Sequence, residues 1–180
     1  IVQAGGGNTL YLGRLDTVFD SAGVLTSWGG DTIFMSRYIT PDPEVEALLT
    51  ELAAPIDELK ATAVGESAVF LVGDRAVCRV QECNLGDLIT DAMRAETGAQ
   101  IAITNGGGIR SNIPVGVDTP ADPALETPQT VTLGDVLTVL PFGNLVSTFE
   151  LTGANVVLAL ENGVSQAENG AGRFPQVSGI

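Results

Sequence analysis

The first apolar pattern along the chain is typical of two β-strands joined by a turn. Residues 11–19 (YLGRLDTVF) and 31–34 (DTIF) are short runs rich in β-branched and aromatic residues. Between them, residues 20–23 (DSAG) form a cluster of turn-forming residues. The pattern therefore predicts a β-hairpin near the beginning of the chain.

A helical pattern follows this hairpin. Asp42 and Pro43 suit the N-cap and the first position of a helix, and Glu44 suits the positive end of its dipole. Pro55 is expected to kink the helix. Apolar residues recur at helical spacing on one face, at Val45, Leu48, Leu49, Leu52, Ile56 and Leu59.

Three polar residues predict the starts of further helices. Asn84 and Thr132 are each followed three residues later by an aspartate, as in a capping box. Thr152 is a candidate cap for a third helix, which we expect to end at Gly163. The predicted helices cover residues 85–96, 133–139 and 153–162.

Short apolar runs at residues 67–72, 100–103 and 145–151 predict strands between these helices. Strands and helices thus alternate without a single repeating order. The sequence therefore predicts an α/β (α+β) fold with a layered mixed β-sheet and flanking helices, preceded by a hairpin and a connecting helix.

Composition and charge narrow the class of protein. Hydrophobic residues make up 44% of the 180 residues, alongside 22 glycines and 9 prolines, which favours a loop-rich folded protein over disorder. No apolar run reaches the roughly 18 residues of a membrane span, so no transmembrane segment is predicted. The net charge of −14 excludes a surface that binds a nucleic-acid duplex through its phosphates, and capture of any anion must depend on local arginines.

A glycine triplet is the most unusual local feature. Gly106, Gly107 and Gly108 follow the apolar run at 100–103, and Asn105 and Arg110 flank them. Three glycines in a row cost ordering entropy, which suggests that another group comes close to this backbone. The alternative is a glycine hairpin with an arginine in solvent. Neither common phosphate-loop pattern fits, because position 111 is serine and the only lysine is distant.

The two cysteines, Cys78 and Cys83, lie five residues apart. They could be two reduced thiols or part of a metal site. A zinc site needs four ligands, however, and the chain contains no histidine and no further cysteine.

Five ordered motifs resemble the C-terminal domain of the 5'-nucleotidase family. The resemblance covers about residues 70–180 and extends to UDP-sugar hydrolases and to 2',3'-cyclic-nucleotide phosphodiesterase/3'-nucleotidases of the same architecture. It implies a role in nucleotide catabolism, by hydrolysis of nucleoside phosphates. The motifs lie at residues 78–88, 105–110, 140–144, 151–153 and 172–176.

The resemblance also implies a domain organisation. Residues 1–40 resemble the terminal hairpin of a metallophosphoesterase domain, residues 41–62 an inter-domain linker helix, and residues 63–180 the substrate-binding domain. We expect the rest of the metallophosphoesterase domain before this chain, as its partner. We also expect a second base-stacking aromatic residue and a ribose-binding acid beyond Ile180.

In this family the N-terminal domain holds two divalent metal ions, such as zinc or manganese, through histidine, aspartate and asparagine. The present chain has no histidine. We therefore expect no metal or other cofactor to be bound by these 180 residues, and no phosphohydrolase activity from them alone.

The same resemblance assigns substrate-binding roles. Arg79 and Arg110 correspond to arginines that hold the phosphate and ribose side of a nucleotide, and Arg75 to a further substrate contact on the same strand face as Arg79. Phe142 corresponds to a base-stacking ring, with a core residue as the alternative. Further expected contacts are Asn105, which binds the base or holds the glycine loop, together with Gly106, Gly107, Gly108 and Asn144.

Family members of the animal type pair the matching cysteines, which implies a disulfide between Cys78 and Cys83 here. Together with the export expected of the family, this predicts a periplasmic or extracellular protein. The substrate class left open is a nucleoside monophosphate, a UDP-sugar or a cyclic nucleotide. The alternative outside enzymes is a non-catalytic nucleotide-binding module.

Overall fold

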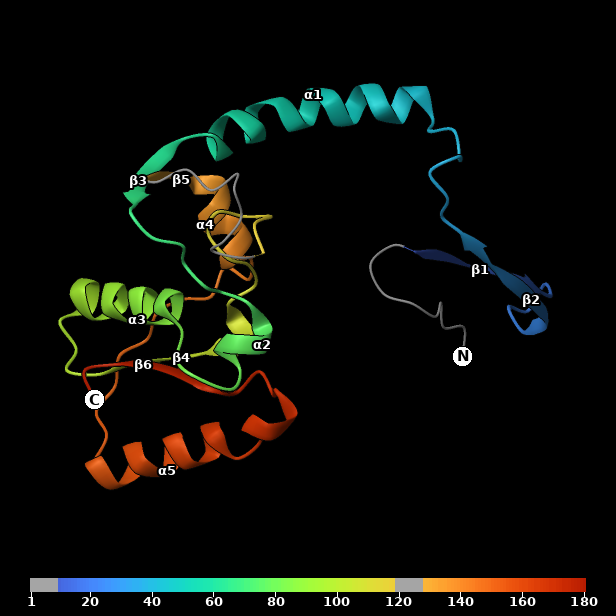
Figure 1. Cartoon of the computed structure of the whole chain (residues 1–180). Helices are drawn as coiled ribbons and strands as arrows, with labels where there is room; N and C mark the ends of the chain where they lie inside the picture. The colour runs from blue at the N-terminus through green and yellow to red at the C-terminus, as the bar shows by residue number, and fades with distance from the viewer. Residues whose placement is uncertain (1–9, 119–127) are drawn as a thin grey trace. The chain divides into compact units, whose positions relative to one another are not determined.

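The computed structural model describes residues 10–118 and 128–180 (Figure 1). The chain divides into two compact units, Ile1–Leu52 and Ala53–Ile180. None of the helices in the described ranges is both long and apolar enough to cross a membrane.

The first unit contains the predicted hairpin. Strands β1 (Tyr11–Phe19) and β2 (Leu25–Phe34) pair antiparallel. Asp20 organises the turn, because its carboxylate accepts hydrogen bonds from the backbone N–H groups of Ala22 and Val24, both at 2.9 Å. Strand β2 begins six residues before the run expected from composition, since backbone pairing continues through its two glycines, which add no apolar signal.

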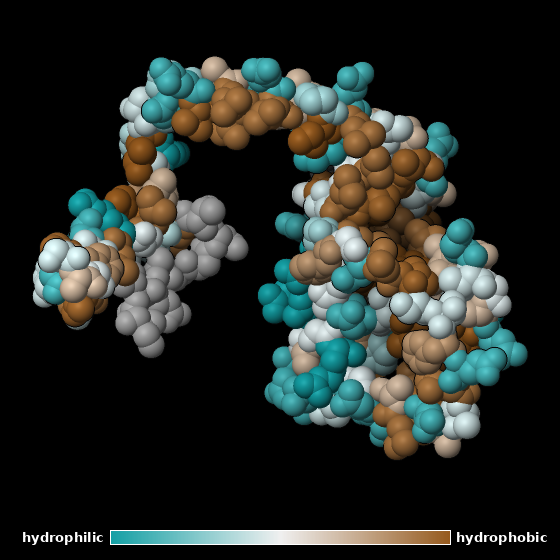
Figure 2. Space-filling view, turned by 180° about the vertical axis from the view of Figure 1, so that it is seen from behind, coloured by the Kyte–Doolittle hydropathy of each residue, from teal (hydrophilic) through white to brown (hydrophobic). Residues whose placement is uncertain are grey.

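Helix α1 (Pro43–Lys60) begins where the capping residues predict. The Asp42 carboxylate accepts from the backbone N–H groups of Glu44 at 2.9 Å and Val45 at 3.2 Å. The helix continues through Pro55 to Lys60. Figure 2 shows hydrophobic residues gathered along one side of α1 and hydrophilic residues along the other, as the 3.6-residue periodicity requires.

The second unit combines small sheets with flanking helices, which confirms the α/β class. Its described strand pairs are antiparallel and two-stranded: β3 (Ala63–Ser67) with β5 (Gln129–Thr132), and β4 (Ala102–Asn105) with β6 (Pro175–Ser178). Helices α3 (Asn84–Thr97) and α5 (Gly153–Val164) lie on opposite sides of the β4–β6 pair (Figure 1). The remaining elements are α2 (Arg75–Cys78), η1 (Gly106–Gly108), α4 (Leu133–Val139) and η2 (Ala167–Asn169).

Two predicted strands are wrong. Strand β3 ends at Ser67, where the serine hydroxyl donates to the carbonyl of Val69 at 2.7 Å and turns the chain. Beyond this turn, Leu71 pairs with Ile113 as an isolated bridge. Residues 145–151 form no strand and are exposed throughout. Their apolar residues favour a strand, but no neighbouring strand among the described residues supplies the hydrogen bonds that a sheet needs.

The helix-capping predictions were correct where the cap is local. Thr132 and Asp135 form the capping box of α4, and the Thr152 hydroxyl accepts from the backbone of Asn155 at 3.4 Å to cap α5. Helix α5 runs past Gly163 to Val164, because Gly163 does not adopt the positive φ of a glycine cap. Gly163 instead allows close packing, since a Cβ there would lie 3.0 Å from the Pro175 ring.

The predicted cap at Asn84 is wrong, because Cys83 is the N-cap of α3. The Asn84 side chain instead joins two segments. Its amide oxygen accepts from the backbone of Val72 at 2.7 Å, and its amide nitrogen donates to the carbonyl of Phe70 at 2.9 Å.

The core of the second unit is small and joins three segments of the chain. It brings together the residue after the glycine triplet, both cysteines and the first turn of α3. Packing of these buried side chains therefore holds the backbones of the three segments against one another. The buried residues of this cluster are Leu71, Cys78, Cys83, Leu85, Ile109, Ile113 and Val139.

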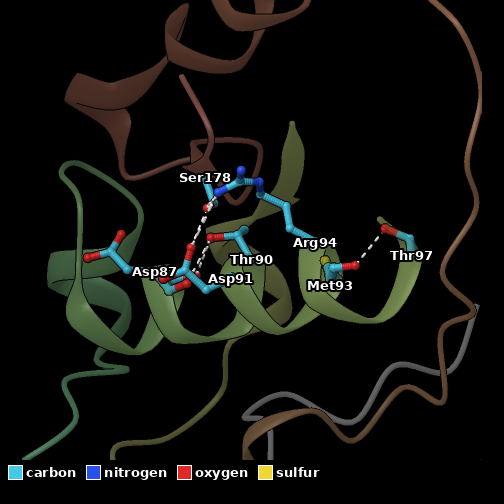
Figure 3. Close-up of polar contacts among 8 residues, drawn as sticks. Asp87, Thr90, Asp91, Met93, Arg94, Thr97 and Ser178 are labelled. Atoms are coloured by element: carbon cyan, nitrogen blue, oxygen red, sulfur yellow. Dashed lines mark hydrogen bonds and ion pairs between the residues drawn. The ribbon is translucent and has the colours of Figure 1, made fainter. Parts of the chain in front are cut away.

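Polar side chains of α3 contact the end of strand β6 (Figure 3). Ser178 donates a hydrogen bond to Asp91 and accepts one from Arg94 at 3.0 Å, which ties the end of β6 to the helix. One turn earlier, burial raises the pKa of Asp87, and the charges of Glu82 and Asp91 raise it further. The folded state therefore binds the Asp87 proton more tightly than the unfolded state does.

This shift predicts a pH-dependent stability change for Asp87→Asn. Because the folded-state pKa is raised, the contribution of Asp87 to stability is fully present below about pH 3.9, the ordinary aspartate value, and is lost as the pH rises through the folded-state pKa. The free energy of unfolding of D87N relative to wild type should therefore increase between pH 3.5 and pH 7. Urea unfolding at several pH values measures this. A difference that does not change with pH would contradict the assignment.

Candidate functional site

The segment from α2 to α3 carries two of the predicted site residues on a constrained loop. Asp74 caps α2 by accepting from the backbone of Ala76 at 2.6 Å. Directly after α2, a disulfide joins Cys78 and Cys83, whose Cα atoms lie 5.3 Å apart, and both cysteines are buried. The predicted disulfide is thus present. We call residues 78–83 the disulfide loop.

The structure corrects the expected setting of Arg75 and Arg79. Both were expected on one face of a strand, but Arg75 begins helix α2 and Arg79 is its C-cap. The two guanidinium groups are nevertheless near enough for the charge of Arg75 to lower the pKa of Arg79. The segment is helical because Asp74 satisfies the first free N–H group and no partner strand is available.

The glycine triplet follows strand β4 as the short helix η1. A Cβ on Gly106 would overlap the carbonyl oxygen of Cys78, and one on Gly107 would lie 2.7 Å from the carbonyl oxygen of Gly172. The N–H groups of Gly106 and Gly107 also donate to the carbonyls of Phe174 at 2.7 Å and Gly172 at 2.8 Å. The group that comes close to this backbone is therefore the protein's own backbone.

The residues flanking the triplet extend this junction. The Asn105 amide donates to the Gly172 carbonyl at 3.1 Å, so it holds the glycine loop, one of the two roles expected for it. Arg110 donates to the Gly107 carbonyl at 3.4 Å. Its guanidinium carbon lies 5.7 Å from the centre of the Phe142 ring, within the range of a cation–π contact.

Three arginines gather beside this junction. Burial lowers the pKa of Arg79, and the positive charges of Arg75 and Arg110 lower it further. The Arg79 Nε atom is buried and has no hydrogen-bond partner among the described residues. Within residues 10–118 and 128–180, the ion pairs lie elsewhere, at Arg14–Asp16 and Arg94–Asp91. The three guanidinium groups therefore form a concentration of positive charge in an acidic protein.

Two hollows contain predicted site residues. Arg75 and Arg110 line a cavity of about 240 Å³ together with Ile109, Asn112 and Asp118. This volume is below the range of about 300 to 1,000 Å³ for sites that enclose a drug-sized ligand, so it could enclose only part of a nucleotide.

The second hollow, of about 1110 Å³, contains Asn105 and Asn144 and lies between β4 and the segment 144–151. The structure thus groups Arg75, Arg79, Arg110 and Phe142. Asn105 adjoins that group through Gly172, whereas Asn144 faces the second hollow.

Two residues of this junction lie in the motif at residues 172–176, but the sequence patterns assigned a role to neither of them. Gly172 receives hydrogen bonds from both Asn105 and Gly107, and Gln176 is 1% exposed and contacts the disulfide loop. A glutamine between Pro175 and Val177 in a short strand could have been noticed, because inward-facing strand positions usually carry apolar side chains.

Comparisons with known proteins agree on one family. The family model for "5'-nucleotidase, C-terminal domain" matches residues 63–180. The chain is 39% identical over 176 residues to the trifunctional nucleotide phosphoesterase protein YfkN of Bacillus subtilis, covering 94% of this chain and 11% of that protein. It is 32% identical over 180 residues to the snake venom 5'-nucleotidase of Naja atra, covering 94% of this chain and 32% of that protein.

A solved structure supports the same comparison. The crystal structure of the 5'-nucleotidase precursor from Thermus thermophilus matches with a TM-score of 0.64 and 42% identity. The match covers 94% of this chain and 32% of that one. The chain therefore spans about a third or less of the length of these relatives.

Proposed function

The chain belongs to the 5'-nucleotidase family, and on that premise we propose that its Ala53–Ile180 unit recognises the nucleotide substrate of a phosphohydrolase. The observation that carries this proposal is the cluster of Arg75, Arg79 and Arg110. Three guanidinium groups without a carboxylate partner among the described residues leave their donors free for an anion. Planar guanidinium forks match phosphate oxygens in geometry and in charge.

The aromatic residue of the cluster suits the other end of a nucleotide. Phe142 is 59% exposed, and Arg110 covers part of its ring. An exposed ring next to a cationic cluster allows one ligand to place its base on the ring and its phosphate on the arginines. We assign phosphate and ribose contacts to Arg79 and Arg110, a further phosphate contact to Arg75, and base stacking to Phe142.

The remaining proposed residues shape the site. Asn105 and the glycines at 106–108 hold the backbone from which Arg110 projects, and Asn144 lies where it could contact the base from the second hollow. Since the net charge is −14, long-range attraction of an anionic ligand is weak. Capture should therefore depend on these local contacts.

Hydrolysis in this family is expected to need two divalent metal ions, such as zinc or manganese, which activate water. The donor set here does not fit such a centre: the sequence has no histidine, and the described residues contain no group of three or more His, Cys, Asp or Glu placed to hold a metal ion. We therefore assign no chemical step to this chain.

We also propose a domain assignment and a location. Residues 1–40 would be the end of a metallophosphoesterase domain and residues 41–62 the linker to the binding domain. A buried disulfide is typical of proteins in oxidising compartments, which supports a periplasmic or extracellular location.

Titration of the chain with AMP and with ribose 5-phosphate tests the binding function. Phe142→Ala should weaken AMP binding by about 1 to 3 kcal/mol through lost stacking, and ribose 5-phosphate binding by much less. Phe19→Ala is the matched control, since Phe19 is 57% exposed and lies in strand β1 of the hairpin. Isothermal titration calorimetry measures the affinities.

Other outcomes would change the proposal. Equal losses for AMP and ribose 5-phosphate would make Phe142 a packing residue rather than a base platform. If the chain binds a UDP-sugar or a 2',3'-cyclic nucleotide more tightly than AMP, that compound class is its substrate instead of AMP. Absence of binding to any nucleotide would overturn the function.

A further inference from the structure

Gln176, the least exposed polar residue of strand β6, connects the disulfide loop to the strand that precedes the glycine triplet. Gln176 is 1% exposed, and its side-chain amide reaches the disulfide loop, more than 90 residues away in sequence. Its nitrogen donates to the carbonyl oxygens of Cys78 at 3.0 Å and Gln81 at 2.8 Å. Its oxygen accepts from the backbone N–H of Cys83 at 3.0 Å.

These three contacts define the orientation of the amide. Two carbonyl oxygens face the NH₂ group and one N–H group faces the oxygen, so a flipped amide would lose all three hydrogen bonds. Both amide hydrogens are used. The side chain also lies where Gly86 has no Cβ, because a Cβ there would overlap the Gln176 amide oxygen. The pocket is therefore built for a glutamine amide.

The backbone of Gln176 pairs with strand β4, which leads into the glycine triplet. In the β4–β6 pair, Gln176 is in register with Thr104, two residues before the glycine triplet. Its side chain meanwhile holds both ends of the loop that carries Arg79. The Cys78 carbonyl bound by Gln176 is also the group that excludes a Cβ from Gly106. A single residue thus sets the position of the disulfide loop relative to the glycine loop.

We propose that Gln176 is a positioning residue that holds the disulfide loop against the glycine loop, so that Arg79 and Arg110 converge on one phosphate group. This inference rests on the proposed nucleotide-binding function. The disulfide closes the loop on itself but does not attach it to β4. Gln176 supplies that attachment.

The test is Gln176→Met, which keeps the approximate volume and removes all three hydrogen bonds. The matched control is Gln129→Met. Gln129 is also buried, at 8% exposure, but lies in β5, and its amide has no partner among the described residues. We expect Q176M to raise the Kd for AMP about tenfold, the size expected for losing a hydrogen bond to a charged group, and to raise the Kd for adenosine, which lacks the phosphate, much less. Q129M should change neither.

Amide hydrogen exchange of Cys83 in the free chain gives a second readout. In wild type this N–H is bound to Gln176, so its exchange should accelerate in Q176M but not in Q129M. If Q176M does not fold, Gln176→Glu replaces it, because it keeps the shape and the acceptor for Cys83 while placing an oxygen opposite two carbonyls. The same contrast between AMP and adenosine is expected.

The outcomes separate the two proposals. Equal losses for AMP and adenosine, or unchanged AMP affinity despite faster exchange at Cys83, would overturn the positioning role while the binding function stands. If wild type binds no nucleotide, the binding function fails and the assigned role in phosphate binding fails with it. The exchange measurement then still reports whether Gln176 holds the loop.

Discussion

Gly106→Ala is expected to destabilise the second unit by about 3 kcal/mol, near the upper end of the range for overpacking a close contact. The added methyl group would overlap the Cys78 carbonyl oxygen, which is backbone and cannot rotate away. Relief requires the disulfide loop to move as a whole, away from both Gly106 and Gln176. The loss of stability should therefore be accompanied by weaker AMP binding.

The matched control for this substitution is Gly108→Ala in the same triplet. A Cβ on Gly108 would meet only the Asn105 side chain, at 3.5 Å, which is an ordinary contact. Gly108 does not have a positive φ, so alanine suits its backbone and reduces the entropy of the unfolded chain. G108A should be neutral or slightly stabilising. Urea unfolding followed by circular dichroism compares the two variants, and equal stabilities would refute the packing explanation.

Arg110→Ala should weaken AMP binding by about 1.5 to 3 kcal/mol, the range for a hydrogen bond to a charged group, which corresponds to roughly a 10- to 150-fold rise in Kd. Arg110 is exposed and projects between the glycine loop and Phe142, so its removal should affect stability little. Arg14→Ala is the control, since it removes the same charge from the hairpin, where Arg14 pairs with Asp16. A similar loss of AMP affinity in R110A and R14A would mean that the effect comes from the change in net charge and not from a direct contact.

A double-mutant cycle distinguishes two roles of Arg110. The residue could bind phosphate directly, or it could orient the Phe142 ring by its cation–π contact. If it only orients the ring, R110A combined with Phe142→Ala should cost no more than Phe142→Ala alone. Additive losses support separate contacts to phosphate and base. Calorimetric titration of the four proteins with AMP measures the coupling.

Local sequence signals predicted some elements well. The capping box at Thr132 and Asp135 and the turn at Asp20 depend on hydrogen bonds between residues two to four positions apart. Such contacts form wherever no partner that is distant in sequence competes for the same side chain. Asn84 shows the limit of this reasoning, because its side chain binds residues 70–72 instead of capping α3. A competing partner distant in sequence was stronger than the local one.

Periodicity likewise predicted which residues share a face but not what they pair with. The apolar run at residues 145–151 predicts a strand, yet the segment pairs with no other strand in the described part of the chain. Arg75 and Arg79 illustrate the converse. Their charges interact although the segment is a helix and its C-cap instead of the expected strand.

The sequence by itself determined the family, the α/β class, the hairpin, the local helix caps and the cysteine pair, because motifs and short-range hydrogen bonds carry that information. Only the tertiary structure decided why two of the three glycines, Gly106 and Gly107, are there. They admit the backbones of Cys78 and Gly172, and Gln176 joins the same junction across up to 98 residues of sequence. Contacts at such separations depend on how elements pack, and no local pattern encodes them.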